Sequence, residues 1–141
     1  MLIGENTKVW HKDKSVILAC TVGDNCTIHA PVWIGNDVII GNNCKVQAFT
    51  FIPTGVKIGD NVFIGPHVCF TNDKYPPSNG EWLETIVENN VVIGAGAVIT
   101  PGITLHHGAI IGAGAVVTKD VPRHTTVVGN PAAPIKPTPR G

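Results

Sequence analysis

The sequence predicts an all-β protein folded as a parallel β-helix, in which short strands wind into coils that stack along one axis. The main observation is a period of six: between residues 16 and 69 every sixth residue is aliphatic. The fifth residue of each unit is small or β-branched, and glycine with Asn or Asp often follows the aliphatic residue, as sharp turns require. Each unit therefore sends two side chains to one side, which a coil hides only by stacking on its neighbours. The aliphatic residues are Val16, Val22, Ile28, Ile34, Ile40, Val46, Ile52, Ile58 and Ile64.

The same period returns after an interruption, in six further units. They begin at Val87, Ile93, Ile99, Leu105, Ile111 and Val117. Because three six-residue sides complete a coil, residues 18 apart should lie above one another, which predicts inward columns such as Val16/Ile34/Ile52 and Cys26/Cys44. An antiparallel sheet would instead show a period of two and hairpin turns.

The repeat leaves room for a single domain, and its breaks divide that domain into five segments. The first segment carries a loose version of the repeat, and we expect it to form an irregular coil that covers the open end of the helix with Trp10 and the charged residues after it. The proline-rich tail should cap the last coil without adding another. The segments are a cap (1–15), a first repeat block (16–70), an external loop (71–86), a second repeat block (87–121) and a tail (122–141), together 1–141.

Charge and cysteine content narrow the possible functions. A formal net charge of zero argues against nucleic acid or an anionic membrane as the main partner. With no charged-then-apolar leader and no 18-residue apolar run, we expect a cytoplasmic protein with reduced thiols. Cys20, Cys26 and Cys44 occupy inward positions, where cysteine acts as a small hydrophobic residue, and only Cys69 should point outward.

One outward column of the predicted helix is apolar. Trp33, Phe51 and Cys69 are each 18 residues apart at the sixth position of their units. Contiguous exposed apolar surface usually marks an interface. A three-sided prism with one such side favours cyclic self-association.

The loop that interrupts the repeat brings reactive side chains close to a histidine. His67 lies at the turn before the break, and Asn72 and Asp73 follow it closely, so we expect the three side chains to share a corner. His67 or Asp73 could accept a proton from an attacking nucleophile, and Asn72 could orient that nucleophile. The same residues could also be ordinary turn formers, although loops on rigid scaffolds often carry chemistry.

The second repeat block has Gly–Ala turns, in VVIGAGAV and AIIGAGAVV. Such turns expose main-chain groups to an extended ligand, or reflect only tight coiling. Lys119 and Arg123, near the end of the block, could hold phosphate groups. The six histidines show no spacing that would bring three imidazoles together within one chain, so we expect no metal site.

Taken together, these motifs resemble one family. The hexads, the external loop, the doubled GAGAV units, TKDVP and the terminal VVGNPA (127–132) look like the left-handed β-helix acyltransferases over nearly the whole chain. NVFIGPHVCFTNDKYP (61–76) resembles the sugar-nucleotide N-acetyltransferases, which acetylate the amine of UDP- or dTDP-linked amino sugars for bacterial surface glycans such as lipopolysaccharide. The resemblance implies a homotrimer that binds acetyl-CoA between neighbouring chains, with the nucleotide sugar entering the same cleft from the other side.

The resemblance also implies roles for individual residues. Asn72 and Asp73, with Tyr75 in the same loop, would bind the acceptor near the attacking amine. His67 is the candidate base, but in some members the leaving thiolate takes the proton. The remaining residues would contact pantetheine or the phosphates of the coenzyme: Gly94, Ala95, Ala97, Gly112, Ala113, Ala115, Lys119 and Arg123.

Departures from the family pattern leave the acceptor sugar open. Pro77 and Ser78 stand where members of this subgroup often have an arginine, and FIPTGV (51–56) differs from the tyrosine-and-acid segment of UDP-sugar members. An O-acetyltransferase acting on a free sugar or serine is the nearest alternative, and it would depend strictly on His67. A γ-type carbonic anhydrase would contain zinc. A structural, surface-binding β-helix would need flat arrays of repeated Thr, which the outward columns lack.

Overall fold

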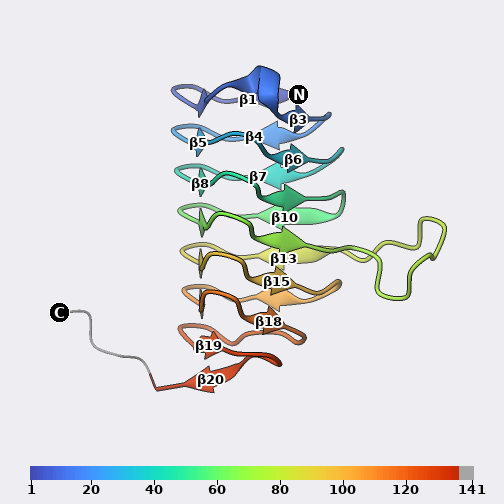
Figure 1. Ribbon diagram of the computed structural model, residues 1–141. Helices are drawn as coiled ribbons and strands as arrows, with labels where there is room; N and C mark the ends of the chain where they lie inside the picture. The colour runs from blue at the N-terminus through green and yellow to red at the C-terminus, as the bar shows by residue number, and fades with distance from the viewer. Residues whose placement is uncertain (137–141) are drawn as a thin grey trace.

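The computed structural model describes residues 1–136 and confirms the predicted β-helix (Figure 1). The chain passes through three sheets in turn, so that each sheet gains one parallel strand per coil. Sheet A contains β1 (Leu2–Ile3), β4 (Thr21–Val22), β7 (Ile39–Ile40), β10 (Val56–Ile58), β13 (Thr85–Val87) and β16 (Thr104–Leu105). Sheet B contains β2 (Lys8–Val9), β5 (Thr27–Ile28), β8 (Lys45–Val46), β11 (Phe63–Ile64), β14 (Val92–Ile93), β17 (Ile110–Ile111), β19 (Thr126–Val128) and β20 (Ala133–Ile135). Sheet C contains β3 (Val16–Ile17), β6 (Trp33–Ile34), β9 (Phe51–Ile52), β12 (Cys69–Phe70), β15 (Val98–Ile99) and β18 (Val116–Val117).

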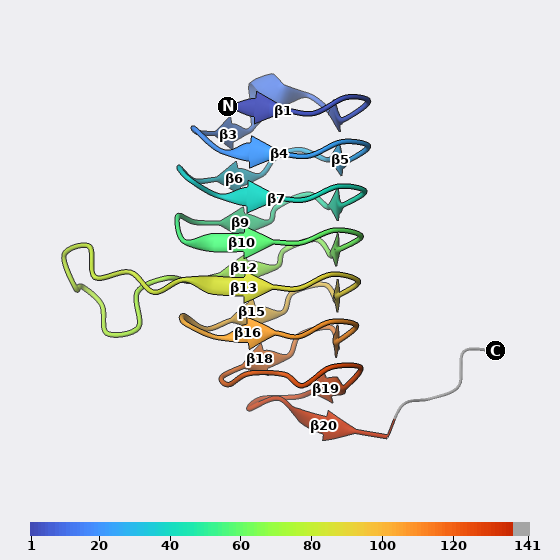
Figure 2. The same cartoon turned by 180° about the vertical axis from the view of Figure 1, so that it is seen from behind.

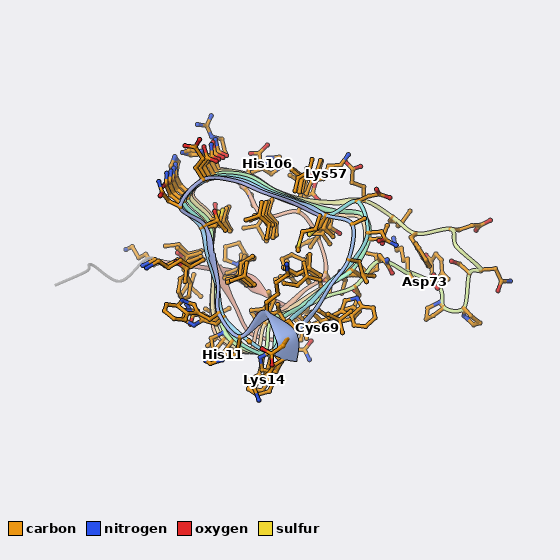
Figure 3. The ribbon with its side chains drawn as sticks, turned by 90° about the horizontal axis from the view of Figure 1, so that it is seen from above. His11, Lys14, Lys57, Cys69, Asp73 and His106 are labelled. Atoms are coloured by element: carbon orange, nitrogen blue, oxygen red, sulfur yellow. The ribbon has the colours of Figure 1, made fainter. Side chains whose placement is uncertain are left out.

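The core is formed by the aliphatic and small residues of the six-residue repeat. Their side chains stack in columns inside the helix, as the view down its axis shows (Figure 3). In most strands the second residue is fully buried while the first faces outward, as in β9, where Ile52 is buried and Phe51 is exposed. The burial of these columns is the main force that holds the coils together.

The first member of the predicted column Val16/Ile34/Ile52 is wrong. Val16 pairs with Trp33 and is 42% exposed, and Ile17 pairs with Ile34 and packs against the core. The short 3-10 helix η1 (Lys12–Lys14) precedes this strand and replaces the regular turn, which shifts the register of the first coil by one residue. The rest of the column, from Ile34 to Ile52, is confirmed.

A ladder of Asn and Asp side chains links the coils where sheet A leads into sheet B, the A–B corner. Each side-chain oxygen accepts the main-chain N–H of the ladder residue one coil nearer the N-terminus, as Asn42 does from Asp24 (2.8 Å) and Asp60 from Asn42 (2.8 Å). The ladder advances 18 residues from Asn42 to Asp60 but 29 from Asp60 to Asn89. The loop therefore adds 11 residues to one coil without disturbing the stack on either side.

That loop leaves the helix after β12 and returns at β13, so it comprises residues 71–84. It projects away from the prism where sheet C leads into sheet A, the C–A corner (Figures 1 and 2). The predicted loop ended two residues later. Thr85 belongs to the helix instead, because it pairs with Val56 and is fully buried.

Both ends of the helix are irregular. At the N-terminus, η1 lies over the first coil, as expected for a cap (Figure 1). At the other end β19 pairs with β17 as a parallel strand, so the tail extends sheet B, contrary to the expectation that it adds nothing to the coils. β20 then pairs with β19 in the antiparallel direction, which ends the parallel stack. Residues 137–141 of the predicted tail lie outside the described part of the chain.

The cysteines follow the predicted pattern. Cys20, Cys26 and Cys44 are buried, and Cys69 is half-exposed at an outward position. Hydrogen bonding from Cys44 lowers the pKa of Cys26 to about 6, and burial raises the pKa of Cys69. Among residues 1–136, no helix has the length and apolar character needed to cross a membrane.

Candidate functional site

The corner where sheet B leads into sheet C, the B–C corner, carries His67 and the Gly–Ala turns in one column. The N–H of His67 donates to the Ala48 carbonyl (3.1 Å), that of Gly96 to Pro66 (2.9 Å) and that of Gly114 to Ala95 (2.8 Å). These bonds stack the turns of successive coils on one another. His67 thus lies one coil nearer the N-terminus than the first Gly–Ala turn.

The Gly–Ala turns form a shelf with little side-chain relief. A Cβ on Gly94 would lie 2.6 Å from the main-chain nitrogen of Ala113, so glycine is needed there for the coils to approach. Gly96 and Gly114 have φ of 71° and 70° with open space beside them, and Ala95 lies exposed on the same surface. The shelf therefore offers backbone to a ligand along two coils.

Two residues predicted to touch a coenzyme have a structural role instead. Ala97 and Ala115 are fully buried in the core. Their N–H groups donate to the carbonyls of Gly94 (3.3 Å) and Gly112 (3.2 Å), and their carbonyls accept from the neighbouring coil. The side chains and the hydrogen-bonding groups of these alanines are thus already used within the helix, which leaves the exposed turn residues beside them for a ligand.

The C–A corner carries the loop, and Asn72 anchors its base. The Asn72 side-chain Nδ2 donates to the Thr54 carbonyl (2.8 Å), and the Asn72 carbonyl accepts from the N–H of Leu83 (2.8 Å). These bonds fix the amide, so that Nδ2 is used while Oδ1 stays available as an acceptor. Asn72 therefore combines a structural bond with a free acceptor atom.

Asp73 has one carboxylate oxygen that is satisfied and one that is not. Its Oδ2 accepts the N–H of Ser78 (3.0 Å), but Oδ1 is buried with no hydrogen-bond partner among residues 1–136. Buried polar atoms usually have a partner, and an unpaired one is costly. Asp73 lies between a groove of about 460 Å³ and a second cavity of about 290 Å³, whose lining includes Tyr75. The groove is lined by residues that include Leu18, Trp33, Phe51, Thr54, Asn72 and Trp82.

The structure separates His67 from Asn72 and Asp73, so the prediction that the three share a corner is wrong. The two-residue strand β12 carries the chain across sheet C between them. His67 therefore lies at the B–C corner and the two loop residues at the C–A corner of the same chain. Each corner holds one half of the predicted site.

The predicted cationic residues lie away from the Gly–Ala shelf in the same chain. Lys119 follows β18 and is exposed at the C–A corner, the corner that carries the loop. Arg123 lies between Val121, which bridges to sheet A, and β19 of sheet B, and is therefore at the A–B corner. Across residues 1–136, no three His, Cys, Asp or Glu side chains are grouped so as to hold a metal ion.

Sequence reasoning missed two residues of these corners. Thr54 holds the Asn72 amide through its carbonyl, a role that no side-chain pattern reveals. Phe49 stacks on His67 with the ring centroids 4.8 Å apart and an angle of 10° between the planes. Its only signal in the sequence is an aromatic residue at a position where later coils have glycine.

Solved structures with this fold include sugar-nucleotide acyltransferases. A variant of AntD from Bacillus cereus, an N-acyltransferase in complex with dTDP and coenzyme A, superposes with a TM-score of 0.86 at 22% identity, over 98% of this chain and 84% of that one. PerB from Caulobacter crescentus, in complex with CoA and GDP-perosamine, gives a TM-score of 0.80 at 22% identity, over 96% of this chain and 58% of that one. At these identities the likeness establishes the fold.

Sequence comparisons point to the same family. The 2,3,4,5-tetrahydropyridine-2,6-dicarboxylate N-acetyltransferase of Enterococcus faecalis is 44% identical over 61 residues, 43% of this chain and 25% of that protein. The chain spans less than half the length of the curated relatives it matches. The family model described as bacterial transferase hexapeptide (six repeats) matches residues 37–72 and 84–119, and that of the hexapeptide repeat of succinyl-transferase matches residues 19–52. Since the first model matches more than half of the chain, the predicted family is confirmed: the chain belongs to the hexapeptide-repeat transferases.

Proposed function

We propose that the chain is an acetyl-CoA-dependent N-acetyltransferase whose acceptor is the amine of a nucleotide-linked amino sugar. The observation that carries this proposal is the pair of half-sites at the two ends of sheet C. One holds an exposed imidazole at the end of a backbone shelf, and the other holds a loop with a free amide oxygen and an unpaired carboxylate oxygen. The described ligands of AntD and PerB, coenzyme A with dTDP or a GDP-sugar, support the same pair of substrates.

The shelf at the B–C corner suits the acyl donor. Pantetheine is an extended chain with two amide groups, and it can lie along exposed turn backbone where no side chain blocks it. The turns around Gly96 and Gly114 provide such a surface over two coils. The thioester end would then lie next to His67, the residue beyond the shelf in the same column.

The loop at the C–A corner suits the acceptor. In the reaction the amine nitrogen attacks the thioester carbonyl, a C–N bond forms, and the C–S bond breaks to release the CoA thiolate. Asn72 Oδ1 can accept a hydrogen bond from the amine and orient it, and Asp73 Oδ1 can accept one from a substrate hydroxyl or amine. The proton lost by the amine goes to His67 or to the leaving thiolate.

The two half-sites meet only if neighbouring chains associate. The outward column of sheet C is apolar along its length, with Trp33 and Phe51 stacked at 6.2 Å between ring centroids. We infer that this column is an interface of a homotrimer, in which the loop of one chain faces the B–C corner of the next. The column consists of Val16, Trp33, Phe51, Cys69, Val98 and Val116.

The same arrangement assigns the coenzyme phosphates to Lys119 rather than Arg123. Lys119 is on the corner that carries the loop, nearer the C-terminus. A neighbouring chain that brings its loop to His67 would therefore bring its Lys119 to the far end of the Gly–Ala shelf. Arg123, at the A–B corner, faces elsewhere. The product, an N-acetylated nucleotide sugar made in the cytoplasm, would serve glycosyl transfer into a surface glycan such as lipopolysaccharide.

Titration calorimetry with acetyl-CoA, followed by a thiol-release assay over UDP- and dTDP-linked amino sugars, tests the proposal. We expect saturable binding of the donor and thiol release with one class of amino sugar. The panel includes free sugars and serine, since release with an alcohol alone would identify an O-acetyltransferase. If a folded protein binds no acetyl-CoA, the acyltransferase proposal fails, and stoichiometric zinc in metal analysis would then favour a carbonic anhydrase.

A further inference from the structure

Phe49 has a backbone conformation that its residue type disfavours. In residues 1–136, eleven non-glycine residues have positive φ, and ten of them are Asn, Asp or His, the types that tolerate the left-handed region. The exception is Phe49, with φ of 65°. A bulky side chain in this region is a true outlier, because its Cβ crowds the following carbonyl.

Burial does not explain this conformation. The Phe49 side chain is 57% exposed at the B–C corner and takes no part in the core. At the same corner in later coils the chain uses glycine, with Gly96 at φ 71° and Gly114 at φ 70°. Strained backbone of this kind concentrates at functional sites, where another contact requires it.

The contact that Phe49 makes is with His67. The two rings stack almost parallel, with centroids 4.8 Å apart and an interplanar angle of 10°. In residues 1–136 the imidazoles of His106 and His107 have hydrogen-bond partners, whereas the ring nitrogens of His67 have none. The face of the Phe49 ring is therefore what holds the plane of the His67 imidazole.

We propose that Phe49 is a positioning residue that aligns His67 for proton transfer at the acyl-donor end of the shelf. This inference depends on the proposed acyl transfer and on His67 as its base. Catalytic imidazoles are usually oriented by a hydrogen bond to the second ring nitrogen. Here the stack orients the ring and leaves both nitrogens free, one to take the proton of the attacking amine and the other open to solvent.

Phe49→Asn separates this role from a structural one. Asn tolerates the left-handed region, so we expect the melting temperature and the trimer to be maintained or improved. We expect kcat to fall about tenfold or more, with KM for acetyl-CoA unchanged, because a misaligned base slows the chemical step and not donor binding. Phe49→Tyr keeps the ring and should keep most of the activity. Asn61→Gly, at a left-handed A–B corner position preceding β11, is the control and should leave kcat unchanged.

A double-mutant cycle with His67→Ala tests whether Phe49 acts through the imidazole. We expect Phe49→Asn to have no further effect on kcat in the His67→Ala background. In NMR spectra of the wild type, the ring protons of His67 should carry the ring-current shift of the stacked Phe49, and Phe49→Asn should remove it. Wild-type kcat in Phe49→Asn, an equal loss in both backgrounds, or loss of the trimer would each overturn the inference. A wild type that transfers acetyl to no acceptor would instead overturn the proposed function itself.

Discussion

At the B–C corner the chain turns within a few residues and repeats the turn in successive coils, whereas at the C–A corner it leaves the helix for residues 71–84. The first corner is held by main-chain hydrogen bonds between coils and by buried alanines beneath the turns. The second depends on a few contacts at the base of the loop, including Asn72 with Thr54 and the ion pair of Lys57 with Glu84 (2.9 Å). The repeat thus builds the proposed donor half, and an interruption of the repeat builds the acceptor half.

This difference suits a transferase that shares its donor with relatives but has its own acceptor. A shelf made from the repeat changes only if the core of the helix changes. A loop of 11 added residues can vary without cost to the stack, because the Asn/Asp ladder continues on both sides of it. The comparison predicts that changes at the two corners have separable effects on donor binding and on turnover.

The largest effect should come from keeping the two corners of different chains apart. Phe51→Asp places a charge in the apolar column of sheet C, where burial against another chain would be unfavourable. We expect smaller species in light scattering and no detectable acetyl transfer. Lys45→Asp, on the exposed face of sheet B in the preceding strand, is the matched control and should stay trimeric. A trimer that survives Phe51→Asp would remove sheet C from the interface.

Asn72→Ala should impair the acceptor half alone. Loss of the amide removes the acceptor atom for the amine and the bond to Thr54, so we expect turnover to fall about a hundredfold, the usual scale for a positioning or proton-transfer group. Calorimetry should show unchanged binding of acetyl-CoA. Asn79→Gly, at an exposed position of the loop with φ of 59°, controls for general loop effects. Near-normal turnover in Asn72→Ala would exclude Asn72 from the site.

Mixed trimers test whether the halves come from different chains. His67→Ala and Asn72→Ala chains are co-expressed, each inactive or nearly so alone. If each cleft takes His67 from one chain and Asn72 from its neighbour, random assortment leaves about a quarter of the clefts intact, with activity to match. If both residues act within one chain, mixing restores nothing.

The fold could be predicted because the period of six fixes which residues are buried. Ile34 and Val87 fall into the core for the same reason, although the loop separates them. The register of Val16 could not be predicted, since it depends on how η1 shortens the first coil. The conformation of Phe49 likewise leaves no trace in the spacing.

Part of the site was within reach of the same period. Six residues make one side of the prism, so His67 and Asn72, almost one unit apart, should have been assigned to successive corners. Ala97 and Ala115 occupy the inward fifth position of their units, and the pattern that placed them in the core argued against a role in coenzyme binding. The contact between Asn72 and the Thr54 carbonyl is different, because it depends on the path of the loop.

The smallest effect, and the sharpest test of the shelf, comes from three glycine substitutions. Gly94→Ala should destabilise the fold by about 2 kcal/mol, because the new Cβ meets the backbone of Ala113 at 2.6 Å and the coils cannot separate. Gly96→Ala and Gly80→Ala each add a Cβ in open space at positive φ, at a cost of about 1 kcal/mol from the left-handed backbone. Gly96 is on the shelf and Gly80 in the loop, so only Gly96→Ala should also weaken acetyl-CoA binding in calorimetry. Equal CoA affinity in these two variants would mean that pantetheine does not lie along the Gly–Ala turns, and the donor half would have to be sought elsewhere on the helix.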